Sequence, residues 1–235
     1  MPKERIAKLD AHVRKCFDLL LVAHKQYANL RPMMGDQKLL DRIGRENKNR
    51  GFDTIRFTLY WNLVQELVKI VADDDGRVPS IHNFRKHFED GQVKGFLKEK
   101  FSVWPSLVKD TYHGELKKVL KQSDKQDENE RRQLFDSRYD KVMKESEELL
   151  NSPALASMKD IRDKILAHNE LNLLSGSYRF VEPKDFGLKY GDERVVLEKA
   201  TLVFDDFFVL VTQIYFDWNE FKAITNRDAD EFWKE

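Results

Sequence analysis

The stretch ERVVLEKATLVFDDFFVLVTQIYFDWNEFKA, residues 193–223, is apolar on nearly every side when it is wound as a helix. Its apolar side chains are Val196, Ala200, Val203, Phe204, Phe207, Phe208, Leu210, Val211, Ile214, Tyr215, Trp218 and Phe221. A helix that is apolar all round is buried on several sides at once. We therefore predict one continuous helix over 193–223 that is the central helix of a bundle or also supplies a subunit interface.

Several other segments place apolar residues at steps of three and four, the spacing of one helical face. The predicted helices are 3–29, 52–71, 124–150 and 153–169. The third is highly charged, which favours a peripheral position. Pro32, Gly35 and a polar run to Gly51 predict a connection between the first two helices.

The remaining segments are predicted from their turn and cap residues. Ser80 is a suitable N-cap for a short helix in SIHNFRKHF, and Pro153 suits the first turn of the helix that begins there. The stretch LLSGSYRFVEPKDFGLKYGDE, 173–193, predicts a loop with a short two-stranded ribbon. Together these segments predict an all-α, antiparallel helical bundle with irregular inserts. We expect a single domain over 1–235, in which 76–125 is an insert.

The composition narrows the class of protein. The 235 residues carry 41 basic and 41 acidic side chains, so the net charge is zero. This balance argues against non-specific coating of nucleic acid but permits contacts with a few phosphates in a local pocket. The single cysteine, Cys16, excludes a disulfide within the chain and is expected in the core.

The N-terminal residues are charged throughout and show no signal-peptide pattern. The longest apolar runs, 19–23 and 207–211, are far too short to cross a bilayer. We therefore expect a cytoplasmic protein with no membrane association.

Cofactor and metal motifs are weak in this sequence. His82 and His87, with Glu89 and Asp90, lack the tight spacing of metal ligands, so surface residues are the favoured interpretation. DDDG at 73–76 lacks the alternation of a calcium loop and predicts a turn. No glycine-rich phosphate loop precedes a helix. We expect neither a metal nor a cofactor.

An arginine followed after four to six residues by a histidine occurs three times: Arg5–His12, Arg77–His82 and Arg162–His168. The bare spacing is common enough to arise by chance, so the surrounding residues must separate the three. Pro79 interrupts the second pair, and the first has no polar neighbour that would assist it. The third pair lies near the end of a predicted helix and before a loop.

On a regular helix, Arg162 and His168 differ by about 120° in direction and about 9 Å along the axis. They would flank an apolar stripe that contains Ile161 and Ile165, with Asn169 nearly beneath Arg162. If this stripe packs against a two-fold mate, each pocket receives the arginine of one protomer and the histidine of the other. The alternative is structural: Arg162 pairs with Asp160 or Asp163, and His168 caps the helix C-terminus.

The sequence RDKILAHNE, 162–170, resembles the signature of HEPN domains (higher eukaryotes and prokaryotes nucleotide-binding), of the abortive-infection AbiU type. Arg162, Asp163 and His168 match the motif positions. RFTLYWNLVQELVKIVADDDG, 56–76, is more loosely similar to the second helix of that group. The resemblance covers about 3–75 and 130–224, whereas 76–125 does not follow it.

The resemblance implies a metal-independent endoribonuclease that acts as a homodimer, commonly as the toxin of an antiphage or toxin–antitoxin system. RNA would be the substrate, and an antitoxin protein a possible partner. Arg162 would stabilise the phosphate, His168 would transfer protons, and Asp163 would orient the arginine or the substrate. Asn169 and Lys164 are weaker candidates for substrate contacts.

Some members of the superfamily are inactive, so the alternative is a catalytically inactive interaction or nucleotide-binding module of the same fold. A helical scaffold outside this family is the third interpretation.

Overall fold

The central helix of the fold is α8 (Asp192–Thr212), which packs against six other helices. Phe204, Phe207 and Leu210 on different sides of α8 are all buried. The sequence prediction of a central helix is therefore confirmed. Its physical basis is the apolar second half of α8, residues 203–211, which is buried on nearly every side, whereas Val195 and Leu202 in the first half are exposed.

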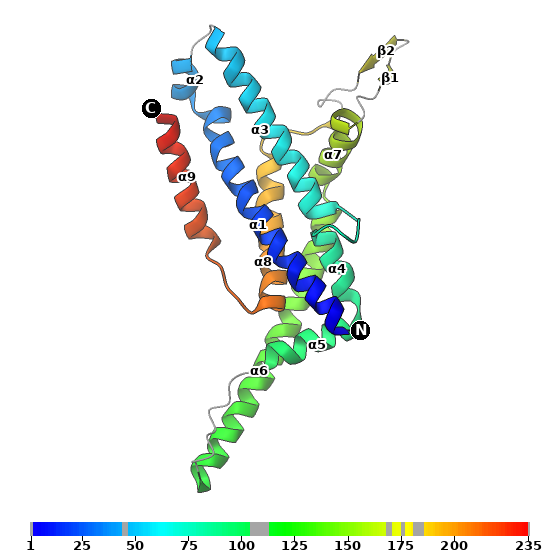
Figure 1. Cartoon of the computed structure of the whole chain (residues 1–235), viewed down its shortest axis with the longest axis vertical. Helices are drawn as coiled ribbons and strands as arrows, with labels where there is room; N and C mark the ends of the chain where they lie inside the picture. The colour runs from blue at the N-terminus through cyan, green and yellow to red at the C-terminus, as the bar shows by residue number, and fades with distance from the viewer. Residues whose placement is uncertain are drawn as a thin grey trace.

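The structure is a computed structural model. It describes residues 2–43, 47–103, 113–167, 171–174, 177–180 and 186–234. Three further long helices surround α8, namely α1 (Pro2–Gly35), α3 (Asn47–Ala72) and α6 (Gly114–Leu150). Figure 1 shows these helices running up and down around a shared core. The all-α bundle is confirmed.

The first helix continues six residues beyond the predicted end at 29, through Pro32 to Gly35. Proline lacks an N–H group and normally weakens a helix interior. Here Met33 is fully buried against Leu39 of α2 (Gln37–Ile43) and Phe52 of α3, so packing outweighs the lost bond. The connection predicted around Pro32 is therefore wrong, because a small second core holds this part of the chain helical.

The predicted continuous helix over 193–223 is also wrong. The chain leaves α8 at Thr212, and a separate helix, α9 (Trp218–Lys234), follows. Gln213 ends α8 in a left-handed conformation, with φ of 60°. Figure 1 shows that α9 then runs back beside α1. Apolar periodicity missed this break because the apolar residues continue through it, with Ile214, Tyr215 and Phe216 between the two helices.

Part of the predicted insert 76–125 is helical and packs on the core. It contains α4 (Ile81–Glu89) and α5 (Gly91–Ser102), which bury Phe84, Phe88 and Leu97. Ser80 caps α4 as predicted, because its side chain accepts a hydrogen bond from the backbone N–H of Asn83. The assignment of 76–125 as an insert in a single domain stays a prediction.

The charged helix α6 begins ten residues before the predicted start at 124, and its first half projects beyond the bundle (Figure 1). The second half buries Phe135, Val142 and Leu149, whereas Leu134 is exposed. Arg138 and Lys141 on this half pair with Asp206 of α8 at 3.4 and 2.9 Å. The charges on the packed half of α6 thus neutralise a buried carboxylate.

The stretch after α6 contains α7 (Pro153–Ile161), a π-helix η1 (Arg162–Ala167) and two short strands, β1 (Leu171–Leu174) and β2 (Ser177–Phe180). Pro153 opens α7 as predicted. The strands pair antiparallel, with Leu171 opposite Phe180, which confirms the predicted ribbon. Within the described residues, no helix combines the length and apolar character that crossing a bilayer requires.

Candidate functional site

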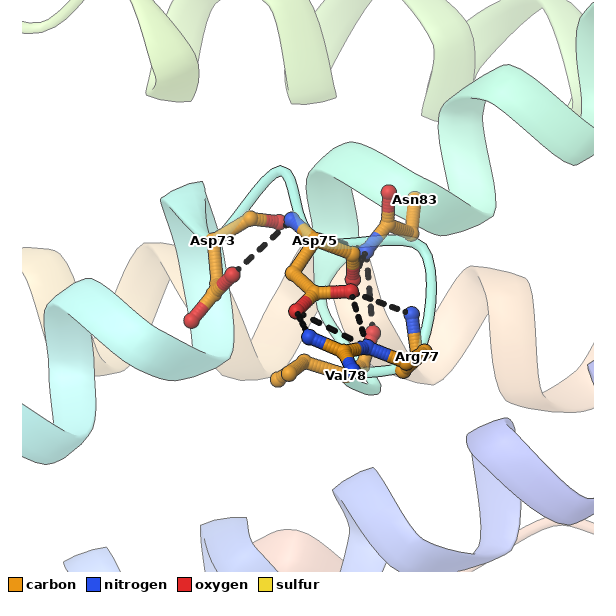
Figure 2. Close-up of polar contacts among 5 residues, drawn as sticks. All are labelled: Asp73, Asp75, Arg77, Val78 and Asn83. Carbon is orange, nitrogen blue, oxygen red and sulfur yellow. Dashed lines mark hydrogen bonds and ion pairs between the residues drawn. The ribbon is translucent and has the colours of Figure 1, made fainter.

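The loop between α3 and α4 forms one wall of the candidate site, and it is fixed by its own side chains. The amide of Asn83 donates to the carbonyl oxygens of Asp75 and Val78, at 2.8 and 2.9 Å (Figure 2). The carboxylate of Asp73 accepts from the backbone N–H of Asp75 at 3.0 Å. These bonds are those of a turn stabilised by aspartate side chains, as predicted for DDDG.

Figure 2 also shows where the arginine of the Arg77–His82 pair points. Its guanidinium donates to the Asp75 carboxylate, at 2.6 Å for the shortest contact. These hydrogen bonds lower the pKa of the Asp75 carboxyl to about 2. The Arg77 side chain is 88% exposed, so it belongs to the solvent side of the loop.

A polar cleft of about 530 Å³ opens behind this loop, bounded by α3, α4, α6, α7 and η1. Arg162 and Asp163, two of the predicted catalytic residues, line it. The other lining residues are Ala72, Asp73, Asp74, His82, Arg85, Glu147, Leu150, Asn151 and Lys159. His168 and Asn169 lie outside the described residues.

Arg162 begins the π-helix, and its side chain is about one-third exposed. Its Nε atom donates to the carboxylate of Asp163 at 2.7 Å. This contact is common to the two interpretations, in which Asp163 either orients the arginine or neutralises it. A π-helix has a wider turn than an α-helix, so the angle expected between Arg162 and His168 on a regular helix does not apply over 162–167. Single π-helical turns occur frequently at functional sites.

Lys164, predicted as a substrate contact, points elsewhere. Its ammonium lies 3.6 Å from a carboxylate oxygen of Asp160 and 5.4 Å from the ring centre of Phe186. It is not among the residues that line the cleft. The structure therefore does not place the Lys164 ammonium in the cleft that Arg162 lines.

His82 is the cleft residue whose role the sequence did not indicate. Its Nε2 atom is buried and has no hydrogen-bond partner within the described part of the chain. Burial, with Lys86 and Lys159 nearby, lowers the pKa of its imidazole, so the ring is neutral near pH 7. The sequence predicted a surface position for His82 and did not predict this cleft, because the residues that line the cleft come from helices distant in sequence.

The charges in the cleft are mixed. Arg85, whose side chain is largely buried, donates to the backbone carbonyl of Met143 at 2.7 Å and lies 3.3 Å from the Glu147 carboxylate. Asp73 and Asp74 add negative charge, and Lys159 and Arg162 add positive charge. A phosphate in this cleft would therefore depend on individual guanidinium contacts, not on a general positive potential.

Of three comparisons with known proteins, one found a match. The family model HEPN_AbiU2, described as AbiU2, matches residues 6–232. No curated protein and no solved structure matches. The match spans nearly the whole chain, including Arg162 and Asp163 in the cleft, and it excludes the interpretation as a scaffold outside the family. The chain is a HEPN-type abortive-infection protein and belongs to the AbiU2 family.

Proposed function

We propose that the protein is a metal-independent endoribonuclease that acts as a cytoplasmic homodimer in abortive infection or antiphage defence. The observation that carries the proposal is the position of Arg162, the motif arginine, in a polar cleft with a partly exposed guanidinium. Membership of the AbiU2 family supports the same role. An antitoxin protein is the expected partner of such a toxin.

In the proposed reaction, the 2′-oxygen of a ribose attacks the neighbouring phosphorus atom. A bond forms between O2′ and phosphorus, and the bond from phosphorus to O5′ breaks. The products are a 2′,3′-cyclic phosphate and a 5′-hydroxyl end. In this step O2′ loses a proton and O5′ gains one. His168 transfers one of these two protons and water transfers the other, because an imidazole titrates near neutral pH.

Arg162 would stabilise the negative charge that builds on the phosphate oxygens, since a guanidinium donates two parallel hydrogen bonds. Asp163 holds the Nε edge of this guanidinium at 2.7 Å. The two terminal nitrogens would then be left for the phosphate. This arrangement is the reason for assigning Asp163 an orienting role.

The test is cleavage of single-stranded RNA by purified protein in the presence of EDTA. We expect cleavage by the wild type and its loss in Arg162→Ala and His168→Ala. His82→Ala is the matched control, because it removes the imidazole that lines the cleft of Arg162 and should leave cleavage intact if His168 is the residue that transfers protons. Loss of cleavage in His82→Ala but not in His168→Ala would transfer the proton-transfer role to His82.

The second candidate is an inactive interaction module of the same fold. The Arg162–Asp163 ion pair favours it, because an arginine that is already paired is less available to a phosphate. This candidate predicts that no preparation, including protein freed of any bound antitoxin by denaturation and refolding, cleaves RNA. It also predicts that expression of the wild type and of His168→Ala is equally harmless to a bacterial host.

A further inference from the structure

A second cavity, separate from the polar cleft, lies between α3 and the segment 186–190. Its volume is about 260 Å³, and its lining includes Arg56, Phe57, Tyr60, Trp61 and Tyr190. Four aromatic rings and one arginine thus line a single small cavity. Pockets for drug-sized ligands are larger, at about 300–1,000 Å³, so the cavity suits a single flat ring system.

The aromatic rings meet edge to face. Tyr60 lies 4.9 Å from Trp61 and 5.6 Å from Tyr190 between ring centres, with interplanar angles of 75° and 67°. None of these contacts is a parallel stack, so the rings leave faces on which a flat ligand can stack. Phe57 is 48% exposed and Tyr190 is 71% exposed, so both of these cavity-lining rings are accessible to a ligand from solvent.

The positive charge of Arg56 in the cavity favours a ligand that carries a phosphate over a cationic ligand such as a quaternary ammonium group. A cage for a quaternary ammonium group needs a cavity without a competing cation. Here the guanidinium of Arg56 lies 5.7 Å from the centre of the Phe57 ring. Among the described residues it forms an ion pair with Asp53 at 2.8 Å, in which the arginine side chain is 28% exposed and the aspartate side chain is 42% exposed. Solvent therefore reaches both members of the pair, which limits its contribution to stability. A phosphate can therefore replace Asp53 as the partner of Arg56.

We propose that this cavity binds one unpaired base of single-stranded RNA, stacked between Phe57 and Tyr190, with the adjacent phosphate on Arg56. Aromatic side chains recognise unpaired bases by stacking, whereas paired bases are unavailable to them. The proposal rests on the proposed ribonuclease function and adds a base-binding subsite to it. Trp61 lies on α3 and Asp73 directly follows it, about 18 Å apart along the helix axis, which is the axial distance that one RNA strand would have to span between the cavity and the cleft.

The test measures RNA binding without cleavage. The protein carries Arg162→Ala and His168→Ala, and fluorescence anisotropy follows its binding to a labelled single-stranded oligoadenylate. We expect Phe57→Ala and Tyr190→Ala each to weaken binding about tenfold, because each removes one stacking face. Arg56→Gln should weaken binding and also reduce its dependence on salt. Phe232→Ala is the matched control, since it removes an exposed ring from α9 and should leave binding unchanged.

Three competitors distinguish an unpaired base of RNA from a paired base and from a free nucleotide. Unlabelled single-stranded RNA should displace the probe, and a duplex of the same sequence should not. Equal affinity of the Phe57→Ala, Tyr190→Ala and parent proteins for the probe would overturn the proposal, as would equal competition by the duplex. A third result would also overturn the proposal in favour of a free-nucleotide site. In that result Phe57→Ala and Tyr190→Ala weaken the binding of AMP but leave the binding of the oligonucleotide unchanged.

The binding test and the cleavage test can fail separately, so failure of the base site is distinguishable from failure of the proposed ribonuclease function. Pocket-dependent RNA binding in a protein whose wild type cleaves nothing would refute the ribonuclease and leave the base site standing. Cleavage by the wild type that is unaffected by Tyr190→Ala, together with unchanged binding, would refute only the base site.

Discussion

At the scale of single residues, Asn83 fixes the wall of the candidate cleft. Its side chain is buried, and its amide bridges the two ends of the loop through the carbonyls of Asp75 and Val78. Ser80, which caps α4, also donates to the carbonyl of Asp73 at 2.6 Å. Two polar side chains thus tie the end of α3 to the start of α4. Their hydrogen bonds hold the cleft wall that includes His82 in place.

We expect Asn83→Ala to lower the free energy of unfolding by about 2–3 kcal/mol, because it removes the hydrogen bonds of a buried amide. The carbonyl oxygen of Val78 then loses its side-chain donor, whereas that of Asp75 still accepts from the backbone N–H of Val78 at 2.8 Å. Arg77→Ala is the control in the same loop. Its ion pair with Asp75 is solvent-exposed, so its removal should leave the free energy of unfolding nearly unchanged. Urea denaturation of Asn83→Ala and Arg77→Ala measures both free energies of unfolding. Equal stabilities would show that the loop does not depend on the Asn83 amide.

His24 is a second buried polar residue, between α1 and α8. Its Nε2 atom lies 2.8 Å from the hydroxyl of Thr201, which itself donates to the carbonyl of Leu197. The hydroxyl proton is therefore used, and the imidazole must be the donor to Thr201. Burial, followed by the charge of Lys222, lowers the pKa of His24 to about 4. The folded protein holds this imidazole neutral.

Because the folded-state pKa of His24 lies below its unfolded value of about 6.5, the unfolded chain binds the proton more readily. Stability should be complete above pH 6.5 and should fall as the pH decreases from 6.5 towards 4. We expect the contribution of His24 to this loss to be about 2–3 kcal/mol.

The variant His24→Gln isolates this contribution, because its amide can donate to Thr201 but does not titrate. Urea denaturation at several pH values should show a shallower loss in the variant. Parallel pH profiles for the two proteins would contradict the assignment.

At the scale of elements, the break between α8 and α9 decides how the bundle closes. Trp218, the first residue of α9, packs on Phe17 and Phe204 with ring centres 5.5 and 6.4 Å apart. Its indole N–H donates to Asp205 at 3.1 Å. At the other end of α9, the indole of Trp233 donates to the carbonyl of Asn29 at 3.1 Å. Two tryptophans therefore hold α9 along α1.

We expect Trp218→Ala to destabilise the protein by about 3–5 kcal/mol, since it removes a large buried ring and leaves a cavity. Hydrogen exchange should also become faster in α9 than in α3, because the docking contact of α9 is lost. Phe232→Ala, on the exposed face of the same helix, should change stability by less than about 0.5 kcal/mol. Unchanged exchange in α9 would contradict this role of Trp218.

At the scale of the whole molecule, the proposed homodimer makes a quantitative prediction. If each site takes Arg162 from one protomer and His168 from the other, a dimer of an Arg162→Ala chain and a His168→Ala chain retains one complete site. Random exchange of equal amounts makes half of the dimers mixed. The mixture should therefore recover about one quarter of wild-type RNA cleavage, although each variant alone is inactive.

Cleavage is measured after denaturing and refolding the two variants together, and sedimentation checks for a particle of twice the 27.9 kDa of one chain. Refolded Arg162→Ala alone and His168→Ala alone are the controls. No recovery from a mixture that does form dimers would place both residues of a site in the same chain.

The sequence by itself determined the helical class of the fold, the central position of α8, the cap at Ser80 and the burial of Cys16. These features follow from residues within one or two helical turns of each other, where periodicity and cap chemistry act locally. The sequence also singled out Arg162 and Asp163, which the fold places in one cleft.

Only the tertiary structure decided where helices end and what the cleft contains. α1 continues through Pro32 because Leu39 and Phe52 bury Met33, and α9 turns back after Gln213 to bury its face against α1. His82 joins Arg162 although eighty residues separate them in the chain. Contacts between distant segments have no local pattern, and their burial energy outweighs the local preferences that a sequence displays.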